Sequence, residues 1–139
     1  MNVLELFAGV GGFRIGLENS DKNFFKTRWS NQWEPSRKSQ DAFEVYNYHF
    51  PNSENIGYSI SNITDEKFAS MDADMIVGGF PCQAFSQAGK KLGFEDTRGT
   101  LFFEIARIIK EKRPKAFLLE NVKNLKSHDK GRTYKTIEK

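Results

Sequence analysis

Short apolar runs alternate with amphipathic segments along this chain of 139 residues. The apolar runs at 2–7, 28–33, 56–63, 74–77 and 116–119 predict five strands, each bounded by glycine, proline or polar residues. Helical spacing of apolar residues fills most of the intervals between them. Strands and helices that alternate at this length predict an α/β fold with a doubly wound, mostly parallel sheet.

Helix boundaries follow from the same pattern. A brief helix is expected over 13–17, directly after a glycine cluster, and Pro35 is expected to open a second helix. Thr64 is a candidate N-cap for a third helix. The last predicted helix covers 101–109 and ends before Pro114. No internal repeat or linker interrupts the pattern, so the sequence predicts one domain or part of one.

Composition narrows the class of protein only slightly. Hydrophobic residues make up 38% of the chain and the formal net charge is +3, which suits a nucleic-acid partner but does not identify one. No signal peptide or long apolar span is visible, so we expect a cytoplasmic protein without a membrane partner. The one cysteine and two distant histidines give no metal-ligand spacing, so we expect no metal.

The first two strands end in residues suited to a nucleotide-like ligand. Ligands bind at the carboxyl ends of strands in open parallel sheets, and the glycines of 7–12 permit close backbone approach there. The spacing does not match the full dinucleotide fingerprint, so a purely structural turn remains an alternative. Gln32, Trp33 and Glu34 place an aromatic face and an acid where a base and a ribose could lie, although a tryptophan at such a position is by itself more often a core residue.

Two later strands end in groups suited to covalent chemistry. Cys82 follows the apolar run 74–77 and a proline that ends the strand, and Glu120 follows the run 116–119. A thiolate can add to an electron-poor ring carbon, and a protonated carboxyl can stabilise the charge that the addition creates. Together they suit activation of a pyrimidine. Separately, Cys82 could be an inert buried thiol and Glu120 a surface or capping acid.

These clusters resemble the DNA (cytosine-5) methyltransferase family over essentially the whole chain. The stretches 79–86, 93–103 and 120–124 carry the resemblance. It implies a Rossmann-like, S-adenosylmethionine-dependent methyltransferase fold, incomplete on its C-terminal side. It also implies that Cys82 attacks C6 of a cytosine flipped out of double-stranded DNA, while Glu120 contacts N3 and the exocyclic amine. The methyl group would pass from S-adenosylmethionine to C5, leaving S-adenosylhomocysteine.

The resemblance also implies a cofactor pocket and a set of DNA contacts. The cofactor-binding residues would be Phe7, Ala8, Gly9, Val10, Gly11, Gln32, Trp33, Glu34, Ile60, Pro81 and Leu101. The DNA-binding residues would be Gln83, Ser86, Gln87, Lys90, Asn121 and Val122. The segment 83–99 matches the loop that closes over flipped DNA in the family, and an ordinary solvated loop is its structural alternative.

The chain departs from the family at two cofactor positions. Many relatives have glutamate where this chain has Gln32, and there the carboxylate takes the ribose hydroxyls; Glu34 is near enough to replace it. After the third strand the family tends to carry Asp-Ile, with the acid on the adenine amino group, whereas this chain has 59–62, Ser-Ile-Ser-Asn. Both differences predict a lower affinity for the methyl donor.

Length is the larger departure. The Gln-x-Arg-x-Arg segment, the target-recognition domain and the final Gly-Asn motif of the family are absent from 1–139. We therefore expect the N-terminal part of a catalytic domain: a fragment, an interrupted gene product, or a split subunit completed by a C-terminal polypeptide, with little turnover alone. A restriction-modification enzyme acting at the nucleoid is the leading hypothesis. The rival is a non-catalytic remnant that binds the donor, DNA or a partner, and a dehydrogenase-like enzyme is disfavoured because it leaves Cys82 and Glu120 unexplained.

Overall fold

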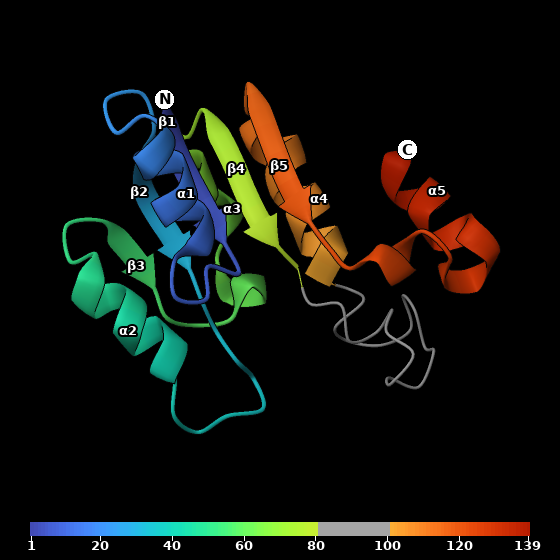
Figure 1. Ribbon diagram of the computed structural model, residues 1–139, viewed down its shortest axis with the longest axis horizontal. Helices are drawn as coiled ribbons and strands as arrows, with labels where there is room; N and C mark the ends of the chain where they lie inside the picture. Colours follow the sequence, from blue (N-terminus) through green and yellow to red (C-terminus); the bar gives the residue numbers. More distant parts are fainter. Residues whose placement is uncertain (81–100) are drawn as a thin grey trace.

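Five parallel strands form the centre of the protein. The computed structural model describes residues 1–80 and 101–139 (Figure 1). The strands are β1 (Asn2–Leu6), β2 (Lys26–Asn31), β3 (Glu54–Ile56), β4 (Met75–Gly79) and β5 (Ala116–Glu120). Their order in the sheet is β3-β2-β1-β4-β5, and all four pairings are parallel. The predicted doubly wound parallel sheet is therefore confirmed, with β1 at its centre.

Helices cover both faces of this sheet. The α-helices are α1 (Gly12–Ser20), α2 (Asp41–His49), α3 (Asp65–Ala69), α4 (Leu101–Lys112) and α5 (Arg132–Glu138). The described 3₁₀ turns are η1 (Ile60–Asn62), η3 (Lys123–Leu125) and η4 (His128–Gly131). In Figure 1, α1 lies on one face of the sheet, and α3 and α4 lie on the other. Right-handed crossovers between parallel strands produce this two-sided arrangement.

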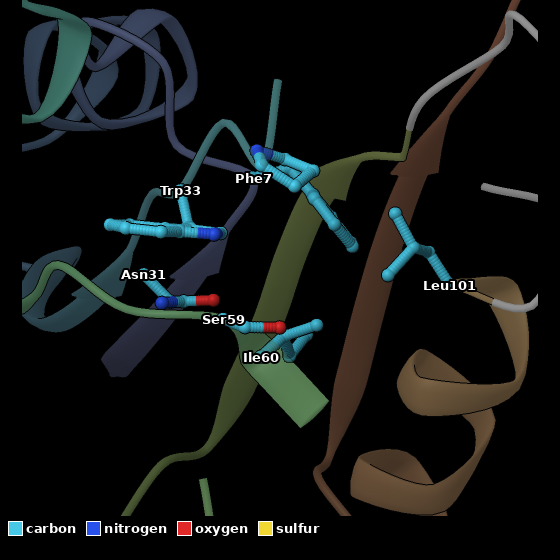
Figure 2. A pocket seen from close by; sticks show the side chains of 7 residues that line it. Phe7, Asn31, Trp33, Ser59, Ile60 and Leu101 are labelled. Carbon is cyan, nitrogen blue, oxygen red and sulfur yellow. The ribbon is translucent and has the colours of Figure 1, made fainter. Parts of the chain in front are cut away.

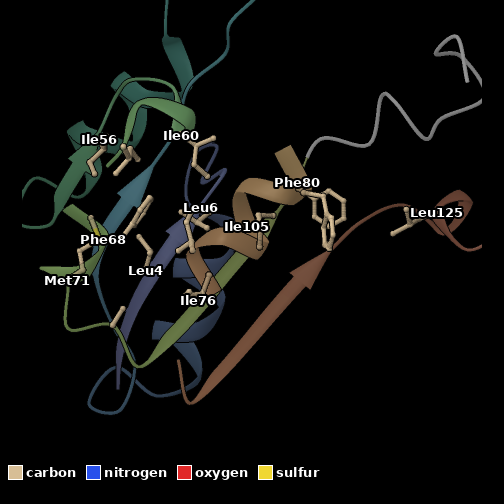
Figure 3. Close-up of a cluster of buried hydrophobic side chains, with 14 residues drawn as sticks. Leu4, Leu6, Ile56, Ile60, Phe68, Met71, Ile76, Phe80, Ile105 and Leu125 are labelled. Atoms are coloured by element: carbon tan, nitrogen blue, oxygen red, sulfur yellow. The ribbon is translucent and has the colours of Figure 1, made fainter. Parts of the chain in front are cut away.

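The main core lies between the sheet and the α3–α4 face. Leu4 and Ile76 from the strands meet Ile105 and Ile108 from α4, and all four side chains are fully buried (Figure 3). Alternate strand residues point to opposite faces, so the neighbours of these strand residues face α1 instead. One of those neighbours, Glu5, is a fully buried carboxyl group.

Several predicted boundaries were wrong: β2 covers Lys26–Asn31 rather than 28–33, and the third strand and the second helix differ most from the prediction. The third strand ends at Ile56 because the Asn31 side-chain amide and the Gln32 backbone N–H both donate to the Ile56 carbonyl oxygen, at 3.0 and 3.1 Å. The chain then leaves the sheet and enters η1. The second helix begins at Asp41 rather than at Pro35. The Gln40 side chain closes the intervening loop, since it accepts from the Glu34 N–H and donates to the Glu34 carbonyl, both at 2.8 Å.

The C-terminal segment from η3 to α5 packs against the core through apolar side chains. Leu125 of η3 is 7% exposed and belongs to the buried cluster (Figure 3). Tyr134 and Ile137 of α5 pack against that cluster. Sequence analysis predicted no element here, because short turns separate these apolar positions. In the part of the chain that the structure describes, no helix has the length and apolar character needed to cross a bilayer.

Candidate functional site

A pocket opens at the carboxyl ends of β1 and β2. Its volume, including open solvent, is about 300 Å³. The residues that line it are Phe7, Asn31, Trp33, Pro35, Ser59, Ile60 and Leu101 (Figure 2). Four of them, Phe7, Trp33, Ile60 and Leu101, were predicted cofactor residues. The fold thus collects side chains from four separate segments around one hollow.

The pocket is shaped to hold a flat, largely apolar group. Trp33 follows the end of β2 and is 38% exposed, whereas Ile60 in η1 is 3% exposed. Figure 2 shows Trp33 and Leu101 at opposite ends of the pocket, with Phe7 and Ile60 between them. Aromatic and aliphatic walls of this kind favour the face of a planar ring.

The glycine loop, residues 9–12, turns sharply beside this pocket. Gly9 and Gly11 have φ of +55° and +100°, and the Gly11 N–H donates to the Ala8 carbonyl at 2.9 Å. Gly9 has no heavy atom within 4 Å of an added Cβ, so space is open beside its backbone. Val10 is 53% exposed. None of 8–11 lines the pocket itself, although all four were predicted to contact the cofactor.

Gln32 holds the glycine loop in place. Its side-chain oxygen accepts from the Gly9 N–H at 2.8 Å. The predicted substitute acid, Glu34, does not line the pocket, and its carboxylate lies 3.6 Å from the Arg37 guanidinium. The amide oxygen of Gln32 therefore has a structural partner within the protein.

Asn31 and Pro35 line the pocket although neither was predicted as a cofactor residue, and Ser59, noted as standing where the family has an acid, lines it too. The Asn31 side chain is buried and donates to the carbonyls of Ile56 and Tyr58, at 3.0 and 2.8 Å. These bonds draw the segment that carries Ser59 and Ile60 towards the end of β2. A polar residue at the end of an apolar run was the available signal, since such a residue needs partners when it is buried.

Glu120 lies at the end of β5, beside the end of β4. Gly79 lies opposite Glu120 in the parallel register, and a Cβ at Gly79 would lie 2.9 Å from a Glu120 carboxylate oxygen. The Asn121 amide donates to the Phe80 carbonyl at 3.1 Å. Val122 is 38% exposed. The Glu120–Asn121 corner is thus fixed against the chain where β4 ends.

Six predicted residues fall outside the described part of the chain. They are the proposed nucleophile Cys82, the cofactor residue Pro81, and the DNA residues Gln83, Ser86, Gln87 and Lys90. Within residues 1–80 and 101–139, no three His, Cys, Asp or Glu side chains gather into a group that could hold a metal ion.

Comparison with known proteins gives consistent matches. The family model "C-5 cytosine-specific DNA methylase" matches residues 1–139. Type II methyltransferase M1.ScrFI of Lactococcus lactis subsp. cremoris is 58% identical over 135 residues, which cover 97% of this chain and 32% of the relative. Type II methyltransferase M.Sau3AI of Staphylococcus aureus is 48% identical over 140 residues, covering 96% and 34% respectively. The chain therefore spans about a third of the length of these relatives.

Solved structures support the fold. A crystal structure of a Spodoptera frugiperda DNMT2 mutant matches with a TM-score of 0.71 and 23% identity, covering 98% of this chain and 40% of that one. The S. pombe Dnmt2 methyltransferase gives the same TM-score of 0.71 at 22% identity, covering 99% and 41%. At this identity the match establishes a shared Rossmann-like architecture.

The glycine loop gives a direct test of this geometry. We expect Gly11→Ala to lower the free energy of unfolding by about 2 kcal/mol, because alanine is strained at positive φ and its Cβ would lie 2.7 Å from the Phe50 ring. Gly12→Ala is the matched control, since a Cβ there has no heavy atom within 4 Å. Urea unfolding measures both, and equal losses would contradict the loop conformation.

Proposed function

This chain belongs to the C-5 cytosine-specific DNA methylase family, and on that premise we propose that it carries the methyl-donor pocket and the nucleophile of a DNA (cytosine-5)-methyltransferase. The observation that carries the proposal is the pocket where Phe7, Trp33, Ile60 and Leu101 meet beside the glycine loop. Its relatives are named Type II methyltransferases, and this favours the catalytic hypothesis over that of a non-catalytic remnant.

The aromatic and aliphatic walls of the pocket suit the adenine of S-adenosylmethionine. Trp33 supplies an aromatic wall for the adenine, Leu101 closes the opposite end, and the open space beside Gly9 leaves room for backbone contact with a ligand. When bound, S-adenosylmethionine supplies an electrophilic methyl group on its sulfonium. The Gln32 side-chain oxygen already accepts from the Gly9 N–H, so its second lone pair and its amide N–H groups remain to bind a ribose hydroxyl.

The proposed chemistry uses Cys82 and Glu120 on the cytosine. The Cys82 thiolate adds to C6, and the electron pair displaced from the C5–C6 bond makes C5 nucleophilic. Glu120 donates a proton to N3 and accepts a hydrogen bond from the exocyclic amine. After C5 takes the methyl group from the sulfonium, a base removes the C5 proton, the electron pair left behind re-forms the C5–C6 double bond and expels the Cys82 thiolate, and N3 returns its proton to Glu120. The position of Glu120 beside Gly79, at the end of the strand that leads to Cys82, supports this pairing.

The proposed substrate is double-stranded DNA with the target cytosine flipped out of the helix. We propose Gln83, Ser86, Gln87, Lys90, Asn121 and Val122 as its contacts. Among the described residues, exposed Val122 and half-buried Asn121 lie next to Glu120, where a flipped base would enter. A DNA substrate in a restriction-modification system would place the protein in the cytoplasm, at the nucleoid.

We also propose that residues 1–139 work as the N-terminal part of a larger catalytic unit. The curated relatives are about three times as long as the matched region. In the described sheet β5 pairs only with β4, and its Phe117 and Leu118 are 57% and 46% exposed. Leu118 also lines a second hollow with Gly12, Phe13, Gly16 and Leu17 of α1. This apolar surface suits a polypeptide that adds to the β5 edge.

A trapping experiment tests the nucleophile. We expect the chain, mixed with S-adenosylmethionine, DNA containing 5-fluorocytosine and a polypeptide that supplies the remaining part of the relatives, to form a denaturation-resistant protein–DNA adduct. Fluorine at C5 blocks the elimination that would release Cys82. Cys82→Ala should abolish the adduct, whereas Glu120→Gln should slow its formation about 100-fold because general acid catalysis is lost. Gel electrophoresis of denatured samples measures the yield of the adduct. If the wild-type chain forms no adduct, the result instead supports a non-catalytic remnant that binds the donor, DNA or a partner.

Replacement of the pocket tryptophan tests the donor site. Trp33→Ala should weaken binding of S-adenosylhomocysteine about 10-fold, because stacking of a base on an aromatic ring contributes about 1–3 kcal/mol. Tyr48→Ala is the matched control, since Tyr48 is an aromatic residue of α2 that is 82% exposed and does not line the pocket. Calorimetric titration measures both, and an unchanged affinity for Trp33→Ala would remove the adenine from this pocket.

A charged substitution tests the assembly surface. Leu118→Asp should prevent binding of the completing polypeptide in a pull-down while leaving the fold intact, because Leu118 is half exposed. Val45→Asp is the control, since Val45 is 42% exposed on α2 and lies outside this surface. If the chain alone self-associates and Leu118→Asp abolishes this association, the surface at Leu118 instead binds a second copy of the chain.

A further inference from the structure

A buried polar cluster lies beneath the glycine loop. It consists of Glu5 on β1, Arg14 on α1 and Tyr46 on α2. Glu5 and Tyr46 are fully buried and Arg14 is 9% exposed. None of the three lines the donor pocket, and the proposed chemistry uses none of them. Burial of a carboxylate among apolar strands is unfavourable unless its partners compensate, so these contacts need an explanation.

Glu5 caps the first turn of α1. One of its carboxylate oxygens accepts from the Arg14 backbone N–H at 3.3 Å, and Arg14 is the third residue of that helix. The residue at the N-cap position, Gly11, has no side chain that could do this. A carboxylate at a helix N-terminus satisfies a free N–H and complements the helix dipole. A side chain from the central strand thereby fixes the start of the helix that the glycine loop enters.

Tyr46 and Arg14 fix α2 against the same loop. The Tyr46 hydroxyl donates to the other Glu5 oxygen at 2.8 Å. The Arg14 guanidinium donates to the Ser53 hydroxyl at 2.7 Å and lies 4.1 Å above the centre of the Phe50 ring. Burial is the largest cause of the raised pKa of Glu5, and the bonds from Tyr46 and Arg14 oppose it. The cluster therefore joins β1, α1 and α2 through one carboxylate.

The glycine loop packs directly against the rings of Tyr46 and Phe50. An added Cβ at Gly11 would lie 2.7 Å from the Phe50 ring and 3.2 Å from the Tyr46 ring, so both rings touch the loop backbone. On its other side the loop is held by the bond from the Gly9 N–H to Gln32. The glycine loop is thus held on one side by Gln32 and on the other by the rings of Tyr46 and Phe50, which the Glu5 cluster positions.

We propose that Glu5 is a positioning residue for methyl-donor binding, acting through Tyr46 and Arg14 to hold the loop 9–12 and the first turn of α1 in the donor-binding conformation. The inference rests on the proposed function, because it takes the pocket beside this loop as the donor site. A loop that is already ordered loses less conformational entropy when the ligand binds, and this raises affinity.

The test compares donor affinity with stability. Tyr46→Phe keeps the ring against Gly11 but removes the hydroxyl from Glu5, and Glu5→Gln keeps an acceptor for the Arg14 N–H but removes the charge. We expect each to weaken S-adenosylhomocysteine binding about 10-fold in calorimetry. The double variant should bind about as weakly as either single variant, because both substitutions break the same connection. Ile108→Val is the control: it destabilises the core on the opposite face and should leave affinity unchanged.

Amide hydrogen exchange separates positioning from general destabilisation. In the donor-free chain, the Gly9 and Arg14 N–H groups should exchange faster in Tyr46→Phe than in the wild type, and saturating donor should restore their protection. Ile108→Val should not show this local change.

The two proposals fail in different ways. A wild-type chain that binds no donor overturns the proposed function and this role with it. A wild-type chain that binds, together with variants that bind equally tightly, overturns only the positioning role. If Glu5→Gln does not fold, Tyr46→Phe decides the matter, because its substitution removes a single oxygen.

Discussion

The parallel pairing of β1 with β2 on one side and β4 on the other places the described candidate residues at the carboxyl ends of the strands. Leu6 lies opposite Asn31 in one pairing and opposite Gly78 in the other. Gly78 permits that approach, since a Cβ there would lie 2.8 Å from the Leu6 carbonyl oxygen. Because all strands run the same way, the segments that follow them emerge together. The pocket and the Glu120 corner both depend on this register.

The two halves of the proposed reaction lie on opposite sides of β1. The sheet order changes direction between β1 and β4, where open α/β sheets form a crevice for ligands. The donor pocket lies on the β2 side, at Phe7 and Trp33, and the Glu120 corner lies on the β5 side. The proposed donor pocket and the proposed base-binding corner therefore have separate walls, with Phe80, directly after β4, between them.

The buried carboxylate of Glu5 connects the core of the protein with the glycine loop. Burial raises the pKa of Glu5, and burial together with the nearby Glu5 charge raises that of Tyr46. An apolar residue at position 5 would avoid this desolvation, but it could not cap α1 or orient Tyr46. In this interpretation, part of the stability that an apolar core would provide is exchanged for a fixed loop conformation. The sequence shows Glu5 only as a polar interruption of an apolar strand.

The sequence alone determined the alternation of strands and helices, the glycine loop after the first strand, and the family through the motifs around Cys82 and Glu120. These features are local, so the periodicity and spacing of neighbouring residues encode them. Only the tertiary structure showed that Asn31 and Pro35 join Trp33 and Leu101 around one pocket, that the third strand ends at Ile56, and that Glu5 caps a helix from another element. Each of these depends on hydrogen bonds or packing between residues distant in sequence, which no local pattern records.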